Sequence, residues 1–192
     1  MNTISVMIVG VGGQGTLLAS KVLGQALVSM DYDVKVSEVH GMSQRGGSVV
    51  TYVRYGDEVH SPIVDLGQAD YMLAFEPLEA ARYLPYLKKD GVIITNTRET
   101  MPMPVITGAA AYPENIVEKL KARANVVALD AMQLALEAGN AKAVNMVLMG
   151  VLAARMDLPE EVWQAALTRQ VPAKFLELNR RAFALGQAQK GV

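Results

Sequence analysis

Four glycines lie within six residues near the start of the chain, in the stretch Gly10-Val11-Gly12-Gly13-Gln14-Gly15. The spacing fits G-x-G-x-x-G, and the stretch follows an apolar run and precedes a nearly uncharged one. In that context the backbone N–H groups of the loop can receive an anion at the positive end of the following helix. The dinucleotide form of the motif also requires an acid about twenty residues further on, and Glu38 could be that acid.

The same glycines fit a tight strand-to-helix turn, in which small residues let the helix approach the sheet. Gly13 adds a fourth glycine to the dinucleotide motif, and His40-Gly41 follows where a ribose would have to fit. A Walker-type phosphate loop is excluded, because Thr16 occupies the position of its lysine. The pattern alone therefore leaves two interpretations open, an anion or nucleotide site and a purely structural turn.

A second polar stretch, EVHGMSQRGGS, covers residues 38–48 and follows the second predicted strand. Arg45 offers a two-pronged contact to an anion, although an ordinary surface arginine fits the sequence as well. Glu76 and Asn96-Thr97-Arg98 end later strands on the same sheet edge if those strands run parallel to the first, and Glu76 could instead cap the next helix. The predicted cofactor-binding residues are Gly12, Gly13, Gln14, Gly15, Ser43, Gln44, Arg45, Gly46, Gly47 and Glu76.

Other chemistries find little support in the residues. Ser43 or Ser48 with His40 lacks the nucleophile elbow that acyl transfer needs. Two histidines, His40 and His60, cannot make a histidine-rich metal site. The absence of cysteine excludes disulfides, a Cys-ligated zinc, a cysteine nucleophile and a cysteine-held iron–sulfur cluster in this chain. We therefore assign no catalytic residue and no metal ligand.

The pattern of expected strands and helices that must position these residues predicts an α/β fold. Strands are expected at 4–9, 34–39, 48–55, 71–75, 92–95 and 126–129, with a hairpin return at 59–62. Helices are expected at 16–30, from residue 77, at 113–123, and in a C-terminal segment at 142–156, 159–169 and 173–187, after an irregular connector at 101–104. We predict a single domain, 1–192, with three α/β/α layers, a mostly parallel, Rossmann-like sheet, and the C-terminal helices packed on it.

Two of the predicted helices are almost free of charge. Residues 15–30 contain only Lys21 as a charged residue, and residues 143–154 contain none. A helix that covers one face of a sheet normally shows a polar face to water. These helices are therefore expected to be buried on both sides, either against another chain or under the C-terminal helices of the same chain.

Net charge and the distribution of charged residues limit the functional classes. A net charge of −1 argues against a nucleic-acid partner, because phosphate contacts need clustered lysine and arginine. The charge-free run at residues 143–154, in the second half of the chain, is far shorter than the roughly 20 residues of a membrane helix. The first residues show no basic segment and cleavage site typical of a signal peptide. We expect a soluble, cytoplasmic protein.

Three stretches together carry a family resemblance: GVGGQGTLLASKVLGQAL, EVHGMSQRGGSVVTYVRYG and VHSPIVDLGQADYMLAFEPLEAARYL. In this order they resemble the gamma-type domain of the 2-oxoacid:ferredoxin oxidoreductases, with EVHGMSQRGGSV and FEPLEA most like the indolepyruvate type, in its beta subunit. The specific motifs run from about residue 4 to residue 87, and the likeness is looser beyond.

The resemblance implies an accessory subunit, inactive alone, of an enzyme that oxidatively decarboxylates aryl 2-oxoacids to acyl-CoA and reduces ferredoxin. It places thiamine diphosphate and the iron–sulfur clusters on a larger partner subunit, with coenzyme A as co-substrate and ferredoxin reached through the complex. Residues 12–15 and 43–47 would then line the coenzyme A or substrate side of the active site. A stand-alone Rossmann-like nucleotide-binding protein and a structural homodimer module are the alternatives.

Overall fold

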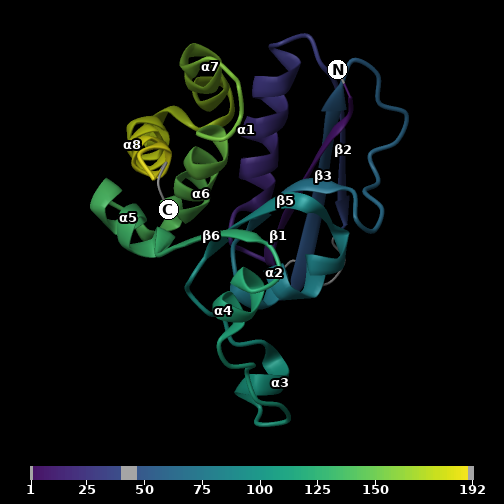
Figure 1. Ribbon diagram of the computed structural model, residues 1–192. Coiled ribbons are helices and arrows are strands. Elements are labelled where there is room, and N and C mark those ends of the chain that lie inside the picture. Colours follow the sequence, from purple (N-terminus) through teal and green to yellow (C-terminus); the bar gives the residue numbers. More distant parts are fainter. Residues whose placement is uncertain (1, 40–46, 190–192) are drawn as a thin grey trace.

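The computed structural model describes residues 2–39 and 47–189, and its centre is a six-stranded sheet with the order β2-β3-β1-β4-β5-β6 (Figure 1). The strands are β1 (Ile4–Val11), β2 (Asp33–Val39), β3 (Ser48–Gly56), β4 (Ala69–Ala74), β5 (Leu87–Asn96) and β6 (Asn125–Leu129). The α-helices are α1 (Thr16–Val28), α2 (Pro77–Tyr83), α3 (Met103–Ile106), α4 (Ile116–Lys121), α5 (Ala131–Ala138), α6 (Val144–Ala153), α7 (Glu160–Gln170) and α8 (Leu176–Gln187). Short 3₁₀ helices occupy Leu84–Tyr86, Ala141–Ala143 and Ala173–Phe175.

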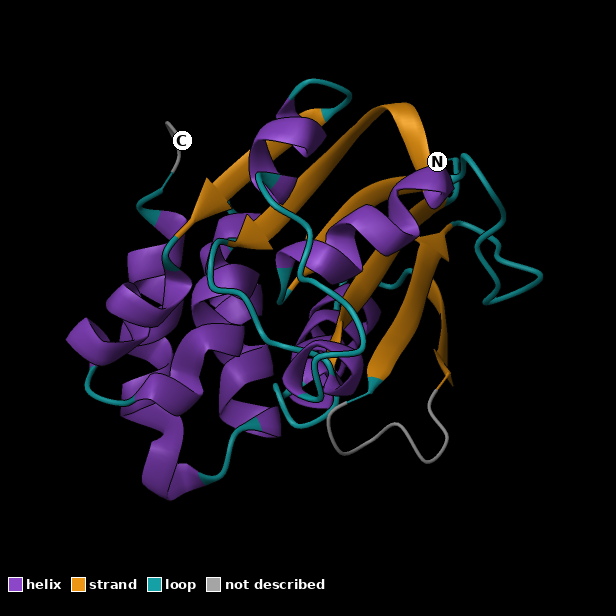
Figure 2. Cartoon of the chain, turned by 90° about the horizontal axis from the view of Figure 1, so that it is seen from below, coloured by secondary structure: helices purple, strands orange, loops and turns teal. Residues whose placement is uncertain are grey.

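Helices cover both faces of the sheet. Successive side chains of a strand point to opposite faces, so Val6 and Ile8 of β1 pack in one core while Met7 and Val9 pack in the other. The first core contains residues of α1, α5, α6, α7 and α8, and the second contains residues of α2 and α4. Figure 2 shows the sheet between the larger helical layer and the smaller one. The predicted three-layer α/β fold is confirmed.

The sheet is mixed because β3 alone runs against the other five strands. β1 pairs in parallel with β4, β4 with β5, and β5 with β6, whereas β3 is antiparallel to both β1 and β2. The predicted helical connection between the first two strands is present, but the strands themselves are not neighbours. β3 lies between them.

The hairpin predicted for residues 48–55 and 59–62 is wrong. β3 already has β1 on one side and β2 on the other, so it has no free edge for a returning strand. Side chains satisfy the backbone of the returning segment instead. The Asp33 carboxylate accepts a hydrogen bond from the Val59 amide at 2.8 Å, and the Arg54 guanidinium donates to the carbonyls of Ser61 at 2.9 Å and Ile63 at 3.0 Å.

The uncharged helix α6 is buried between the sheet and α8. All residues from Asn145 to Ala153 are buried, and the backbones of α6 and α8 approach closely at Gly150 and Gly186. Of the two explanations for a charge-free helix, cover by the C-terminal helices of the same chain is therefore the one confirmed for α6. The predicted helix at 142–156 is shorter, since a 3₁₀ turn at Ala141–Ala143 precedes it.

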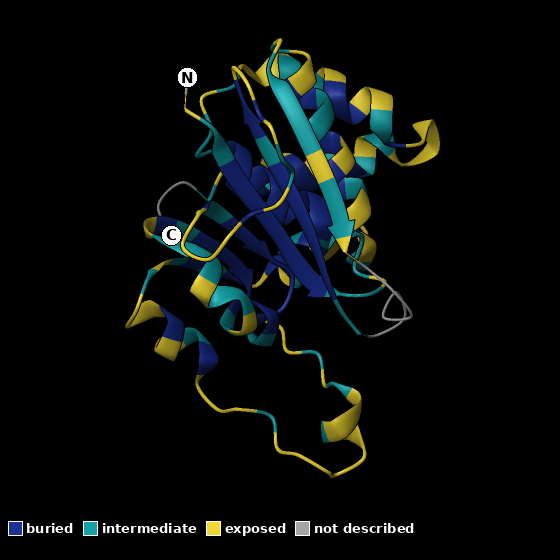
Figure 3. Cartoon of the chain, turned by 90° about the vertical axis from the view of Figure 1, so that its right-hand side faces the viewer, coloured by how far each residue is buried: buried dark blue, intermediate teal, exposed yellow. Residues whose placement is uncertain are grey.

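Residues 97–115 project from the body of the molecule, as the largely exposed segment in Figure 3 and the loop around α3 in Figure 1 show. The connector expected to be irregular at 101–104 is irregular only at 101–102, because the single turn of α3 already begins at Met103. The helix predicted from residue 113 begins only at Ile116, because Asn115 adopts a left-handed conformation with φ of 55°.

Candidate functional site

The glycine loop, residues 10–15, joins β1 to α1 in a conformation that requires glycine. Gly13 and Gly15 have φ values of +100° and +86°, in the left-handed region. A Cβ on Gly15 would lie 2.7 Å from Nδ2 of Asn145 on α6, whereas a Cβ on Gly13 would meet no atom within 4 Å. Both the backbone conformation and the lack of space beside Asn145 therefore explain why residue 15 is glycine. At Gly13 only the backbone conformation requires glycine, and the space beside it is open.

Gln14 fastens the glycine loop to the segment that follows β5. Its Oε1 accepts a hydrogen bond from the Val11 amide at 2.8 Å, and its Nε2 donates to Oγ1 of Thr100 at 3.4 Å. The side chain is folded back over the loop, since a Cβ on Gly10 would lie 2.8 Å from Oε1 of Gln14. Gln14 thus joins the loop after β1 to the segment after β5, and these two strands lie on either side of β4.

Glu76 is a buried junction at the end of β4. Only 1% of the residue is exposed, and its carboxylate accepts hydrogen bonds from the Glu79 amide at 3.0 Å, the Thr100 amide at 3.3 Å and the Tyr112 hydroxyl. Burial raises the pKa of the Glu76 carboxyl, and the three hydrogen bonds oppose that rise. The residue caps α2, as the sequence allowed, and in addition holds both ends of the projecting segment.

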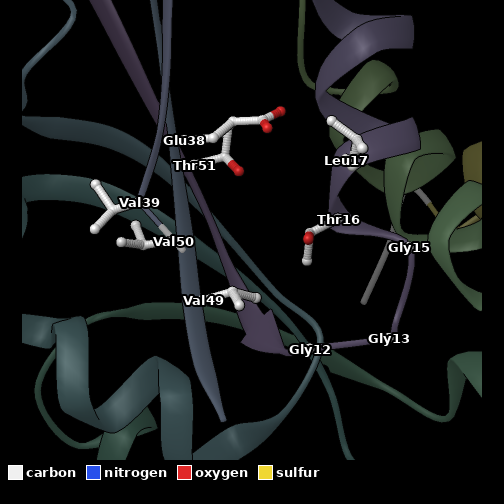
Figure 4. A pocket seen from close by; sticks show the side chains of 10 residues that line it. All are labelled: Gly12, Gly13, Gly15, Thr16, Leu17, Glu38, Val39, Val49, Val50 and Thr51. Carbon is white, nitrogen blue, oxygen red and sulfur yellow. The ribbon is translucent and has the colours of Figure 1, made fainter. Parts of the chain in front are cut away.

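One cavity, of about 350 Å³, opens between the glycine loop and the ends of β2 and β3. Figure 4 shows Glu38 and Thr51 on the strands, facing Thr16 and Leu17 of α1. Ser20 donates a hydrogen bond to Oε1 of Glu38 at 3.3 Å. The residues that line this cavity are Gly12, Gly13, Gly15, Thr16, Leu17, Glu38, Val39, Val49, Val50 and Thr51.

This geometry argues against the dinucleotide alternative. Because β3 is inserted, Glu38 ends a strand that lies two strand spacings from β1, roughly 10 Å rather than 5 Å. In addition, the Gly12 amide donates to the carbonyl of Gly47 at 2.9 Å, so this loop N–H is already used within the chain. The acid and the amide that the dinucleotide motif needs are therefore not arranged around one ligand position.

A larger cavity, of about 550 Å³, lies on the other side of the glycine loop, and we call it the switch-point cavity. Its lining residues are Gly13, Gln14, Gly15, Phe75, Asn96, Arg98, Thr100, Met132, Ala141, Lys142 and Val144. The chain leaves β1 towards β2 on one side and leaves β4 towards β5 on the other. Open α/β sheets bind ligands at such a reversal, outside the carboxyl ends of the strands.

Two positively charged side chains lie at the switch-point cavity. Arg98 and Lys142 are exposed, and within residues 2–39 and 47–189 neither side chain makes an ion pair or a side-chain hydrogen bond. Asn96, by contrast, is 4% exposed and accepts a hydrogen bond from the Ala131 amide at 3.1 Å. The charge of this cavity is thus positive and comes from the two residues that remain available to a ligand.

Sequence reasoning identified this sheet edge but missed Lys142. The lysine lies beyond the last strand, in a 3₁₀ turn that packing brings back to the edge, and no local motif marks it. Gly12 to Gly15, Gly47 and Glu76 do lie together, through the contacts of Gly12 with Gly47 and of Gln14 and Glu76 with Thr100. The predicted Ser43, Gln44, Arg45 and Gly46, with His40 and Gly41, lie outside the described residues, and their roles stay predictions.

Within the described ranges, no cluster of three or more His, Cys, Asp or Glu side chains could hold a metal ion. Over the same part of the chain, no helix has the length and apolar character needed to cross a membrane.

The family model for pyruvate ferredoxin/flavodoxin oxidoreductase matches residues 5–189. The chain belongs to this family. Among curated relatives, it is 45% identical to the indolepyruvate oxidoreductase subunit IorB of Thermococcus kodakarensis, covering 97% of this chain and 95% of the relative. It is 38% identical to the subunit of the same name from Archaeoglobus fulgidus, covering 97% and 94%.

Two solved structures share the fold of the chain. The gamma subunit of a keto/oxoacid ferredoxin oxidoreductase from Geobacter sulfurreducens superimposes with a TM-score of 0.73 at 24% identity, covering 97% of this chain and 98% of that one. A 2-oxoglutarate:ferredoxin oxidoreductase from Magnetococcus marinus gives a TM-score of 0.71 at 17% identity. The match covers 99% of this chain but 31% of the Magnetococcus chain, so there the fold is one part of a longer polypeptide.

Proposed function

We propose that the chain is the accessory subunit of a cytoplasmic, thiamine-diphosphate-dependent 2-oxoacid:ferredoxin oxidoreductase. The complex oxidatively decarboxylates aryl 2-oxoacids of the indolepyruvate type to acyl-CoA, with ferredoxin as electron acceptor. The observation that carries this proposal is the 45% identity to indolepyruvate oxidoreductase subunits over 97% of the chain. Likeness of this extent and level supports a shared role within the complex as well as a shared fold.

The reactive cofactors belong to a larger companion subunit in this proposal. Thiamine diphosphate supplies the stabilisation of the carbanion left by decarboxylation, and iron–sulfur clusters carry the electrons away. This chain contains no cysteine, so it offers no thiolate to a cluster. Its own contribution is a wall of the active-site region, which makes it inactive alone.

The switch-point cavity is the part of that wall that we assign to coenzyme A. Coenzyme A carries several phosphate groups, and an arginine fork and a lysine ammonium are the side chains best suited to phosphate. Arg98 and Lys142 provide them, while Gly13 and Gly15 line the same cavity. The Magnetococcus enzyme, which shares this fold, was solved with coenzyme A and succinyl-CoA bound. Glu76 takes part indirectly, by holding Thr100 in place.

Co-expression with the companion subunit tests the proposal. The purified complex is expected to reduce ferredoxin with aryl 2-oxoacids in the presence of coenzyme A, and each subunit alone is expected to be inert. Calorimetry of the isolated chain with NAD and AMP is the control for the nucleotide-binding alternative, and no heat of binding is expected. Turnover by the isolated chain, or tight nucleotide binding without association with a larger subunit, would overturn the proposal.

A further inference from the structure

The projecting segment is apolar at its surface. From Thr100 to Pro113 the chain has no charged residue, and we call this stretch the apolar arm. Met101 is 42% exposed, and Met103 and Ile106 are each 64% exposed, so these side chains are turned outward. Soluble proteins seldom display contiguous apolar surface without a partner for it.

The arm is held in a defined shape. The Thr100 amide, at 3.3 Å, and the Tyr112 hydroxyl both donate to the Glu76 carboxylate, so its two ends are pinned to one buried residue. Within the arm, the Thr107 amide donates to the Met103 carbonyl at 2.9 Å, and the Ala110 amide donates to the Pro104 carbonyl at 3.0 Å. A surface that is already ordered loses less conformational freedom when it binds.

The composition of the arm resembles the centre of a protein interface. Met103 and Ile106 form the apolar tip, and methionine adapts its shape to a partner surface. Charged residues, Arg98, Glu99 and Glu114, stand only at the base. An apolar centre within a polar rim is the usual arrangement of a specific interface.

The position of the arm indicates which partner it meets. Thr100, at its root, lines the switch-point cavity and accepts the hydrogen bond from Gln14 of the glycine loop. A subunit that closes this cavity therefore approaches the edge from which the arm extends. In the Magnetococcus chain the same fold accounts for only 31% of the polypeptide, so that fold is joined there to further domains.

We infer that the apolar arm inserts into an apolar groove of the thiamine-carrying companion subunit and secures that subunit over the switch-point cavity. The inference rests on the proposed function. It adds a docking element that is separate from the residues assigned to coenzyme A.

Charge placed on the arm tests the inference. Met103→Asp and Ile106→Asp are compared with Leu66→Asp, because Leu66 is 65% exposed and lies in the loop before β4. That loop precedes the amino end of β4, whereas the arm follows the carboxyl end of the parallel strand β5. The isolated variants are expected to melt at the wild-type temperature. The Kd for the purified companion subunit is expected to rise by at least about 30-fold for the arm variants, as for interface hot spots, and to change little for the control.

Ile106→Ala is the second variant, because it removes apolar area without adding charge, and it should weaken binding in the same direction. If wild type binds the companion and the arm variants bind as tightly, the docking role is overturned while the proposed function stands. If wild type binds no companion, the proposed function itself fails. If wild type sediments as a dimer that the arm variants convert to monomer, the arm binds a second copy and the inference is overturned.

Discussion

Gly150 of α6 and Gly186 of α8 face each other's helices at a separation that leaves no room for a side chain. A Cβ on Gly150 would lie 2.0 Å from the carbonyl oxygen of Phe183, and a Cβ on Gly186 would lie 2.0 Å from the carbonyl oxygen of Val147. The two helices therefore pack backbone against backbone. This close packing is what buries the uncharged surface of α6.

Gly150→Ala and Gly186→Ala are each expected to destabilise the isolated chain by about 1–3 kcal/mol or more, because an overpacked interface forces the helices apart. The melting temperature should then fall by roughly 2–4 °C per kcal/mol. Gly24→Ala in α1 is the matched control, since its Cβ would meet only Cγ2 of Val36 at 3.9 Å. Alanine there should leave stability unchanged or raise it by up to about 1 kcal/mol. Equal effects at all three positions would refute the packing explanation.

Gly13 and Gly15 separate two reasons for glycine in one loop. Both have positive φ, so alanine at either is expected to cost about 1 kcal/mol or more in backbone strain. Only Gly15→Ala also collides with Asn145, and it should therefore be clearly the more destabilising change in urea unfolding. A Gly13→Ala variant as unstable as Gly15→Ala would show that the contact with Asn145 does not matter.

Glu76 makes stability depend on pH. Burial raises its pKa above the ordinary value of 4.5, so the folded state holds its proton at pH values where the unfolded chain has released it. Its contribution to the free energy of unfolding is therefore fully present below pH 4.5 and is lost as pH rises through the raised pKa. Glu76→Gln lacks this dependence. The stability difference, wild type minus variant, should decrease from acidic to neutral pH in urea titrations, and a difference that grows would contradict the assignment.

The same substitution has a second effect at pH values where Glu76 is ionised. The amide offers one acceptor oxygen where the carboxylate serves three donors, from Glu79, Thr100 and Tyr112. We therefore expect the variant to be less stable by about 1–3 kcal/mol at neutral pH, from unsatisfied buried groups. Tyr112→Phe, which removes one donor and leaves the carboxylate, is the milder comparison.

Arg98→Ala and Lys142→Ala test the coenzyme A assignment in the assembled complex. Each is expected to raise the KM for coenzyme A by about tenfold or more, the value of one charge-assisted hydrogen bond, with little change in the KM for the 2-oxoacid. Lys121→Ala, on the exposed side of α4, is the control. Unchanged coenzyme A kinetics in both variants would remove the switch-point cavity from the site. Arg45→Ala extends the test to the predicted residues outside the described ranges.

Much of the sheet could be predicted from the sequence, because the buried strands are short apolar runs bounded by turns. Strands such as Ile4–Val11 and Asn125–Leu129 begin and end within a few residues of their expected limits. The position of β3 could not be predicted. Its neighbours are chosen by pairing over long sequence distances, such as Val6 with Val53, and the local turn at Gly56 suggested a hairpin instead.

The sequence directed attention to the sheet edge where the candidate site lies, but not to the contacts that its residues make. Gln14 and Glu76 lie at the sheet edge expected for them, and in the structure both hold loops together. Lys142 reaches the cavity only because the helices after β6 fold back over the sheet. The short helix Ala131–Ala138, capped by Asp130, was not predicted, and the residues that it buries are the small Ala131, Ala135 and Ala138.

The partnership of α6 with α8 has a consequence for the handling of the protein. A chain cut before α7 would still possess every strand of the sheet, but the face of α6 that packs on α8, around Val147, Gly150 and Val151, would lie bare to water. Such a fragment would expose a large apolar surface and would be prone to aggregate. Helices α7 and α8 thus shield this apolar surface from water, and any fragment made for crystallisation or binding work has to include them.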